Sequence, residues 1–206
     1  MEIKQIVTGM IGENCYLVCQ NGSALIIDPG AEPEKIKQAI ETAAVKPLAI
    51  LLTHTHYDHI GAVDDIRDVY EIPVYVSPLE QDWLGDPVKN FSADKSSPVT
   101  ARDAEHLFEM DKFYDIGEFH FKVVHTPGHS PGSVSLLFEE DGVAFTGDAL
   151  FGGSVGRTDI PGSEPEKLLP GIQKQLFTLP DDTRVYPGHR GDTTIGREKK
   201  TNPYFQ

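Results

Sequence analysis

The sequence contains few cysteines, few cationic side chains and no long apolar run. Its two cysteines, Cys15 and Cys19, are too few for a disulfide scaffold or for a zinc site made of four thiolates. Both lie in the apolar run NCYLVC, which predicts buried thiols in a strand. No segment has the ~20 apolar residues of a membrane span, and the N-terminal residues lack the apolar core of a signal peptide. We therefore expect a cytoplasmic protein with no membrane partner.

Acidic side chains outnumber basic ones. The 206 residues include 32 Asp and Glu against 18 Lys and Arg, which gives a net charge of −14. Nucleic acids and anionic membranes bind clustered Lys and Arg, so this balance argues against both as partners. It does not identify a substrate, because most of the charge lies on a solvated surface. With 39% hydrophobic residues, the chain can bury a sizeable core, and we expect one domain over residues 1–206.

Apolar runs alternate with turn residues and amphipathic stretches along the whole chain. Strands are predicted in IKQIV, CYLVC, ALIID, LAILLT (48–53), PVYV (73–76), FHFKVV, SVSLLF, VAFT and RVY (184–186). Helices are predicted over residues 33–44, 60–70, 164–177 and 193–201. Residues 85–100 show little periodicity and predict a surface excursion. This interleaving of strands and helices indicates an α/β sandwich.

A group of imidazoles and a carboxylate follows the apolar strand that ends near Thr53. The segment THTHYDH contains His54, His56, Asp58 and His59. Side chains two residues apart in extended chain point the same way, so His54 and His56 share one side. Asp58 and His59 follow where the chain should turn into the next helix. Imidazole and carboxylate are ligands of zinc, iron and manganese, so this spacing can supply two neighbouring metal positions.

Other predicted strands end in a similar way. His129 lies in HTPGHS, Asp148 in TGD and His189 in PGH, each in a turn rich in glycine or proline. A single histidine after a strand is more often structural, but repeated placement at strand ends predicts a common edge, where sites of α/β proteins form. His125 opens HTPGH and is expected to anchor the turn that presents His129.

The motifs THTHYDH, HTPGH, TGDALF and PGH, in this order, resemble the metallo-β-lactamase superfamily. GDALF, GR and TTIGRE…NP resemble its glyoxalase II-like branch, the hydroxyacylglutathione hydrolases, in particular the short single-domain bacterial members. The resemblance covers nearly the whole chain. It implies a four-layer αβ/βα sandwich without a C-terminal helical glutathione-binding domain. It also implies a metal-dependent hydrolase that cleaves a small-molecule thioester such as S-lactoylglutathione.

The same resemblance implies a centre for two divalent metal ions. Zinc is the first expectation, with iron or manganese as alternatives. The implied ligands are His54, His56 and His129 on one ion, Asp58, His59 and His189 on the other, and Asp148 as the bridge. A metal-bound hydroxide would attack the acyl carbon, because a metal lowers the pKa of its water from ~15.7 toward ~7. Asp58 is expected to be a ligand alone or also the catalytic group that orients the hydroxide.

Arg157, in the segment GRTD, matches a basic residue that contacts the glutathione carboxylate in glyoxalase II. It would then bind substrate, although an ion pair with Asp159 that braces the loop fits the sequence equally well. The chain departs from the family at Asp159, where an aromatic residue is usual, and at Arg190, where glycine is common. These two departures argue against glutathione as the carrier thiol, but they do not argue against thioester hydrolysis.

The alternative from another reaction class is a mononuclear-iron persulfide dioxygenase. Such enzymes share the fold and the GRTD segment, and they would use the residues that match His54, His129 and Asp148. A metal count and a measurement of oxygen uptake separate the two functions.

Overall fold

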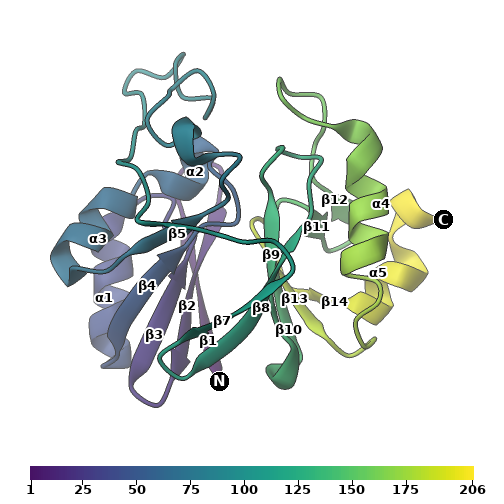
Figure 1. The fold of residues 1–206 in the computed structure, drawn as a ribbon, viewed down its shortest axis with the longest axis horizontal. Helices are drawn as coiled ribbons and strands as arrows, with labels where there is room; N and C mark the ends of the chain where they lie inside the picture. Colours follow the sequence, from purple (N-terminus) through teal and green to yellow (C-terminus); the bar gives the residue numbers. More distant parts are fainter. The chain divides into compact units, whose positions relative to one another are not determined.

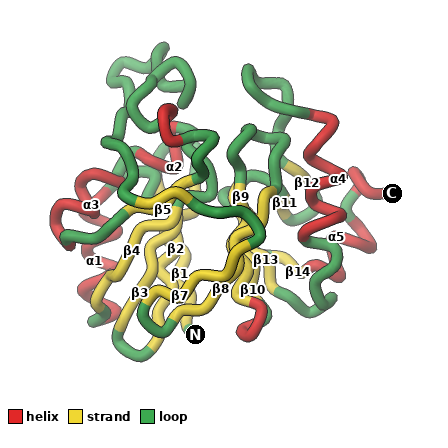
Figure 2. Tube along the Cα trace, viewed as in Figure 1, coloured by secondary structure: helices red, strands yellow, loops and turns green.

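The computed structural model describes residues 1–206, and the chain divides into two compact units. The first comprises residues 1–108 and 115–119, and the second comprises residues 109–114 and 120–206. Each unit is built around one six-stranded sheet, and helices cover a face of each sheet (Figures 1 and 2). None of the helices is both long enough and apolar enough to span a membrane.

The sheet of the first unit has the strand order β1-β2-β3-β4-β5-β6. Its strands are β1 (Glu2–Thr8), β2 (Glu13–Gln20), β3 (Ser23–Ile27), β4 (Lys46–Leu51), β5 (Val74–Val76) and β6 (His106–Leu107). The first three pair antiparallel, and β3 to β6 pair parallel. The helices of this unit are α1 (Pro33–Ala43), α2 (Tyr57–Ile60) and α3 (Val63–Tyr70).

Helices α1 and α3 cover one face of this sheet (Figure 1). Ile36 and Ile40 of α1 and Val63 and Ile66 of α3 are buried in one apolar core with strand residues such as Ile50. Their spacing of three or four positions places them on one side of each helix, as the sequence pattern predicts. The two free cysteines on β2 are buried, which confirms that prediction.

The sheet of the second unit has the strand order β14-β13-β10-β9-β8-β7. Its strands are β7 (Lys112–Ile116), β8 (Phe119–His125), β9 (Val134–Phe138), β10 (Val143–Gly147), β13 (Arg184–Pro187) and β14 (Thr193–Thr194). A small hairpin of β11 (Leu150–Phe151) and β12 (Ser154–Val155) follows β10. Helices α4 (Pro165–Gln175) and α5 (Ile195–Thr201) complete the unit, and Leu168, Ile172 and Ile195 pack in its core.

The structure differs from the sequence prediction where elements are short. The helix predicted over residues 60–70 begins three residues later, as α3, and a separate short helix, α2, precedes it and contains Asp58 and His59. The short strands β6, β7, β11, β12 and β14 are absent from the prediction. Gly61 marks the break between α2 and α3, where a Cβ would lie 2.4 Å from the carbonyl oxygen of Gly30. This close approach depends on tertiary packing and leaves no periodic signal in the sequence.

Candidate metal centre

The predicted ligands lie just beyond the carboxyl ends of strands in each sheet. In the first sheet the segment THTHYDH follows β4. In the second sheet His129, Asp148 and His189 follow β8, β10 and β13. Strands β10 and β13 are parallel, and β8 and β10 both pair antiparallel with β9, so these three strands run in the same direction. The predicted placement after strand ends is therefore confirmed, and in the second sheet the three residues lie at a common edge.

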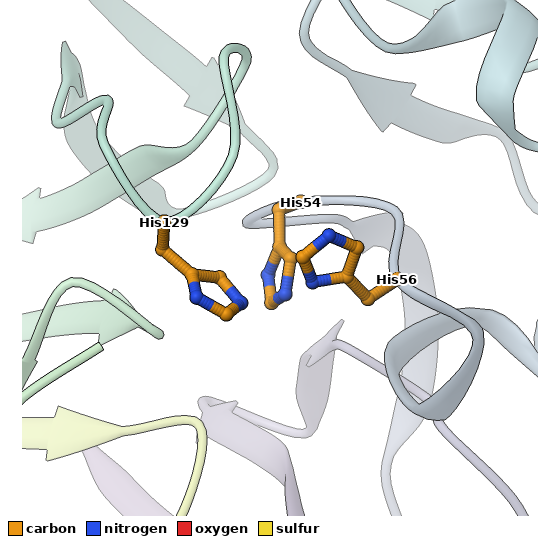
Figure 3. A group of neighbouring side chains, drawn as sticks. All are labelled: His54, His56 and His129. Carbon is orange, nitrogen blue, oxygen red and sulfur yellow. The ribbon is translucent and has the colours of Figure 1, made fainter. Parts of the chain in front are cut away.

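Three imidazoles of the first unit are packed against one another. The His54 ring centroid lies 4.7 Å from that of His56, edge to face, and 4.0 Å from that of His59. Asp58 joins them, with Oδ2 at 3.5 Å from His59 Nε2. Figure 3 shows that His54 and His56 project from the same loop. All three histidines are at most 5% exposed, so the cluster is a buried set of candidate nitrogen ligands beside the partly buried Asp58 carboxylate.

Helix α2 is held against the loop that follows β3. A Cβ on Gly30 would lie 1.7 Å from the carbonyl oxygen of Asp58 and 2.5 Å from Glu13 Oε2. Only glycine permits this approach, which fixes the start of α2 and the direction of its Asp58 and His59 side chains. Burial raises the pKa of the Glu13 carboxyl well above its ordinary value, and the nearby His59 opposes that shift.

Asp28 orients two of the imidazoles. Its Oδ2 accepts hydrogen bonds from His59 Nδ1 at 3.0 Å and from Thr53 Oγ1 at 2.5 Å. Thr53 Oγ1 also lies 3.2 Å from His54 Nδ1. A histidine whose Nδ1 proton is held in this way presents Nε2 to a metal, as is usual for metal-ligating histidines. Asp28 is not among the predicted site residues, and the available signal was a carboxylate at the end of the buried strand in ALIIDPG.

A second buried carboxylate braces the same loop. Glu80 is fully buried, and its Oε2 accepts hydrogen bonds from Thr55 N at 2.8 Å and Thr55 Oγ1 at 3.0 Å. Because Thr55 lies between His54 and His56, Glu80 fixes the backbone that carries both rings. The loop between β4 and α2 is thus held by carboxylates at two points.

In the second unit Asp148 lies between two imidazoles. Its Oδ2 is 3.5 Å from His129 Nε2 and 3.6 Å from His189 Nε2. His129 Nδ1 donates to the carbonyl oxygen of Arg157 at 2.8 Å, which again leaves Nε2 as the metal-binding nitrogen. Figure 3 shows His129 at the tip of its own loop. In that loop, His125 Nε2 donates a hydrogen bond to the carbonyl oxygen of Pro131 at 2.8 Å. The prediction that His125 anchors this turn is confirmed.

A buried glutamate supports the hairpin that follows Asp148. Glu198 accepts hydrogen bonds from Gly153 N at 2.8 Å, Thr193 Oγ1 at 2.6 Å and Asn202 Nδ2 at 2.8 Å. These contacts join the turn between β11 and β12 to β14 and to the residue that follows α5. They explain the motif TTIGRE…N, in which Thr193, Glu198 and Asn202 form one buried network.

Arg157 is paired with Asp159 by two hydrogen bonds, of 2.7 Å from Nε and 3.0 Å from Nη2. Both side chains are exposed, and the Arg157 hydrogen bond lowers the pKa of Asp159. This is the loop-bracing pair of the sequence analysis, and the contact of Arg157 with a substrate anion stays a prediction. Arg190 has a φ of 69°, a left-handed conformation that glycine adopts without strain.

The donor set fits a divalent metal. It consists of imidazole nitrogens and carboxylate oxygens without a thiolate, which suits zinc, iron or manganese. The partners of Nδ1 at His54, His59 and His129 leave one nitrogen of each ring for an ion. The structure therefore supports the ligand chemistry expected in each unit.

Replacing Gly156 by alanine is expected to disturb the candidate metal ligands of the second unit. A Cβ at this position would lie 1.8 Å from the carbonyl oxygen of Asp148 and 3.1 Å from His129 Cβ. We expect Gly156→Ala to weaken metal affinity by about 10–100-fold, the range for a displaced ligand support. Gly191→Ala is the control, because its Cβ would meet no atom within 4 Å. Equal metal affinities of the two variants would show that Gly156 does not set the position of Asp148.

The family model of the metallo-beta-lactamase superfamily matches residues 8–189. Two curated relatives align over the whole chain. A probable metallo-hydrolase of Bacillus subtilis is 43% identical over 206 residues and is covered over 98% of its length. The hydroxyacylglutathione hydrolase GloC of Haemophilus influenzae is 34% identical over 208 residues, with 98% of its length covered.

Solved structures show the same architecture. BLEG-1 B3 metallo-beta-lactamase superposes with a TM-score of 0.96 at 44% identity, with complete coverage of both chains. TTHA1623, solved in a di-iron-bound form, gives a TM-score of 0.85 at 39% identity and covers 98% of this chain and 99% of its own. ETHE1 from Myxococcus xanthus gives a TM-score of 0.77 at 29% identity, with 98% and 84% coverage.

Proposed function

Because the chain belongs to the metallo-beta-lactamase superfamily, we propose that it is a glyoxalase II-like hydrolase of acyl thioesters that uses two divalent metal ions. The observation that carries the proposal is the Asp148 carboxylate between the His129 and His189 imidazoles. A carboxylate so placed can bridge two cations. Within the first unit, the imidazoles of His54, His56 and His59 would supply further nitrogen ligands.

The proposed ligands are those of the sequence analysis: His54, His56, Asp58, His59, His129, Asp148 and His189. When bound, the ions supply positive charge for the acyl oxygen and a water that is acidic enough to act as a nucleophile near pH 7. Asp28 and the Arg157 carbonyl hold the Nδ1 protons of His59 and His129. Asp58, which is less buried than His54, His56 and His59, is proposed to orient the attacking water. Arg157 is proposed as an anion contact once its pair with Asp159 opens.

Several findings support this choice. GloC carries the name hydroxyacylglutathione hydrolase and aligns over the whole chain. No serine or cysteine nucleophile is needed, because the acyl group is attacked by water. The di-iron form of TTHA1623 supports iron as an alternative to zinc. The persulfide dioxygenase alternative shares part of the ligand set, so the reaction itself must be tested.

The test combines metal analysis with a substrate panel. The purified protein is loaded with zinc, iron(II) or manganese(II), and bound metal is counted by mass spectrometry. Thiol release is followed with S-lactoylglutathione and with thioesters of other thiols, ring opening with a cephalosporin, and oxygen uptake with glutathione persulfide. We expect about two ions per chain and thiol release without oxygen uptake. A single iron per chain together with persulfide-dependent oxygen uptake would establish the dioxygenase instead.

A further inference from the structure

Two aromatic side chains from the segment after β5 pack around the His56 ring. The Trp83 ring is stacked on it at 6.1 Å with an interplanar angle of 30°, and the Phe91 ring lies at 4.9 Å. His56 is buried, whereas Trp83 and Phe91 are half-buried and keep part of their surface exposed. Phe91, which lies in the segment 85–100 predicted as a surface excursion, and Trp83, which lies just before it, therefore contribute aromatic surface directly beside a proposed metal ligand.

Phe91 is held in an unfavourable backbone conformation. Its φ is 64°, a left-handed value that is rare for a bulky side chain. The buried residues on either side maintain it: Asn90 Oδ1 accepts from Ser92 N at 3.1 Å and from Ser92 Oγ at 2.7 Å. Asn90 Nδ2 donates to Val99 O at 2.9 Å, and Ser92 Oγ accepts from Val99 N at 2.9 Å. Strain that is maintained by its surroundings is typical of ligand-binding positions.

A lysine and a tyrosine lie in the same region. The Tyr57 N–H donates to Asn90 O at 2.9 Å, which ties helix α2 to the loop that carries Phe91. Lys95 Nζ lies 3.9 Å from the centroid of the Tyr57 ring. Lys89 of the same segment forms an ion pair with Asp82. The Lys95 ammonium instead lies over the Tyr57 ring. A cation held on an aromatic face and exposed to solvent can bind an anionic group.

We propose that Phe91, Tyr57 and Lys95 form a binding site for an acyl thiol that carries a carboxylate. The two rings contact the apolar part of the ligand beside His56, and Lys95 pairs with the carboxylate. The inference rests on the proposed function, because it identifies the ligand as the thioester substrate of that site. It adds a second cation to Arg157 as an anion contact, in a chain whose net charge is −14.

Trp83 provides a direct measure of binding, because it is the single tryptophan of the chain and it stacks on His56. The probe is S-hexylglutathione, a thioether that cannot be hydrolysed, added to the metal-loaded protein and followed by tryptophan fluorescence and calorimetry. We expect Lys95→Gln to weaken binding about tenfold or more, the scale of a charged hydrogen bond. Phe91→Leu, which keeps an apolar side chain, is expected to weaken it about fivefold.

The controls distinguish the loss of the Lys95 charge from a general loss of structure. Lys89→Gln removes a lysine from the same segment that is already paired with Asp82, and it should bind the probe as the wild type does. The diethyl ester of the probe lacks both carboxylates, and its affinity should be the same for Lys95→Gln and the wild type. Melting temperature should not change in Lys95→Gln, because the side chain is exposed.

The outcomes distinguish this inference from the proposed function, since binding is measured without turnover. No binding of the probe by either method, or equal affinities of the wild type and Lys95→Gln, would overturn the inference even if thioesters are hydrolysed. Lys95-dependent binding without hydrolysis of any thioester would support the binding site and contradict the proposed function.

Discussion

Asp148→Asn is expected to remove at least one metal ion and to lower the rate of hydrolysis by roughly 10²-fold or more. Asparagine keeps the shape of the side chain, but it removes the negative charge and replaces one carboxylate oxygen with an amide nitrogen, which does not bind a cation. Asp148 Oδ2 lies within 3.6 Å of both His129 Nε2 and His189 Nε2, so the lost charge is one that would neutralise ions bound by these rings. We expect the variant to bind less metal while its fold stays intact.

Metal content by mass spectrometry, circular dichroism and thioester hydrolysis are the measurements for this variant. Asp192→Asn is a matched control, because Asp192 lies in the same unit and pairs with Arg184 at the surface. It should keep the metal content and rate of the wild type. If Asp148→Asn also keeps both, the bridging role of Asp148 is wrong.

The sequence predicted the long elements and the position of the candidate ligands at strand ends because both depend on local patterns. His129 and His189 follow apolar strands and lie next to glycine and proline, and these signals need no knowledge of the tertiary structure. The THTHYDH segment is equally local. Helices α1 and α4 begin at Pro33 and Pro165, a position where proline is favourable.

The supporting groups could not be predicted because their partners are distant in the sequence. Asp28 contacts His59, 31 positions away, and Glu80 contacts Thr55, 25 positions away. Helix α2 has four residues, too few to show a helical period, and the packing of Gly30 against Asp58 fixes its start. The loop around Phe91 likewise depends on hydrogen bonds of buried Asn90 that composition does not reveal.

The position of the Arg157 side chain could not be predicted for a different reason. Sequence reasoning left open whether it contacts a substrate anion or pairs with Asp159, and the structure shows the pair. The two possibilities differ in where a flexible side chain lies, which neither periodicity nor motif spacing determines. Lys95 shows the converse, since no motif contains it and its place over Tyr57 follows from the tertiary fold.

Asp28→Asn is expected to reduce metal affinity at the His59 position by about 10–100-fold, with a comparable loss of activity. Asp28 has a φ of 48°, and asparagine tolerates this conformation, so the backbone should stay in place. The amide nitrogen, however, would face donors at His59 Nδ1 or at Thr53. His59 can relieve that conflict by moving its proton from Nδ1 to Nε2, and a protonated Nε2 cannot bind a metal.

The tautomer of His59 is therefore the measurement that separates this explanation from simple destabilisation. In nitrogen-15 NMR of the metal-free protein, His59 should carry its proton on Nδ1 in the wild type and on Nε2 in Asp28→Asn. Glu80→Gln is the matched control: it also removes a buried charge beside this loop, but its contacts are the N–H and hydroxyl of Thr55 rather than an imidazole. We expect it to lower stability by about 1 kcal/mol and to leave the tautomer unchanged. An unchanged His59 tautomer in Asp28→Asn, together with weak metal binding, would show that Asp28 acts through the fold and not through the proton of His59.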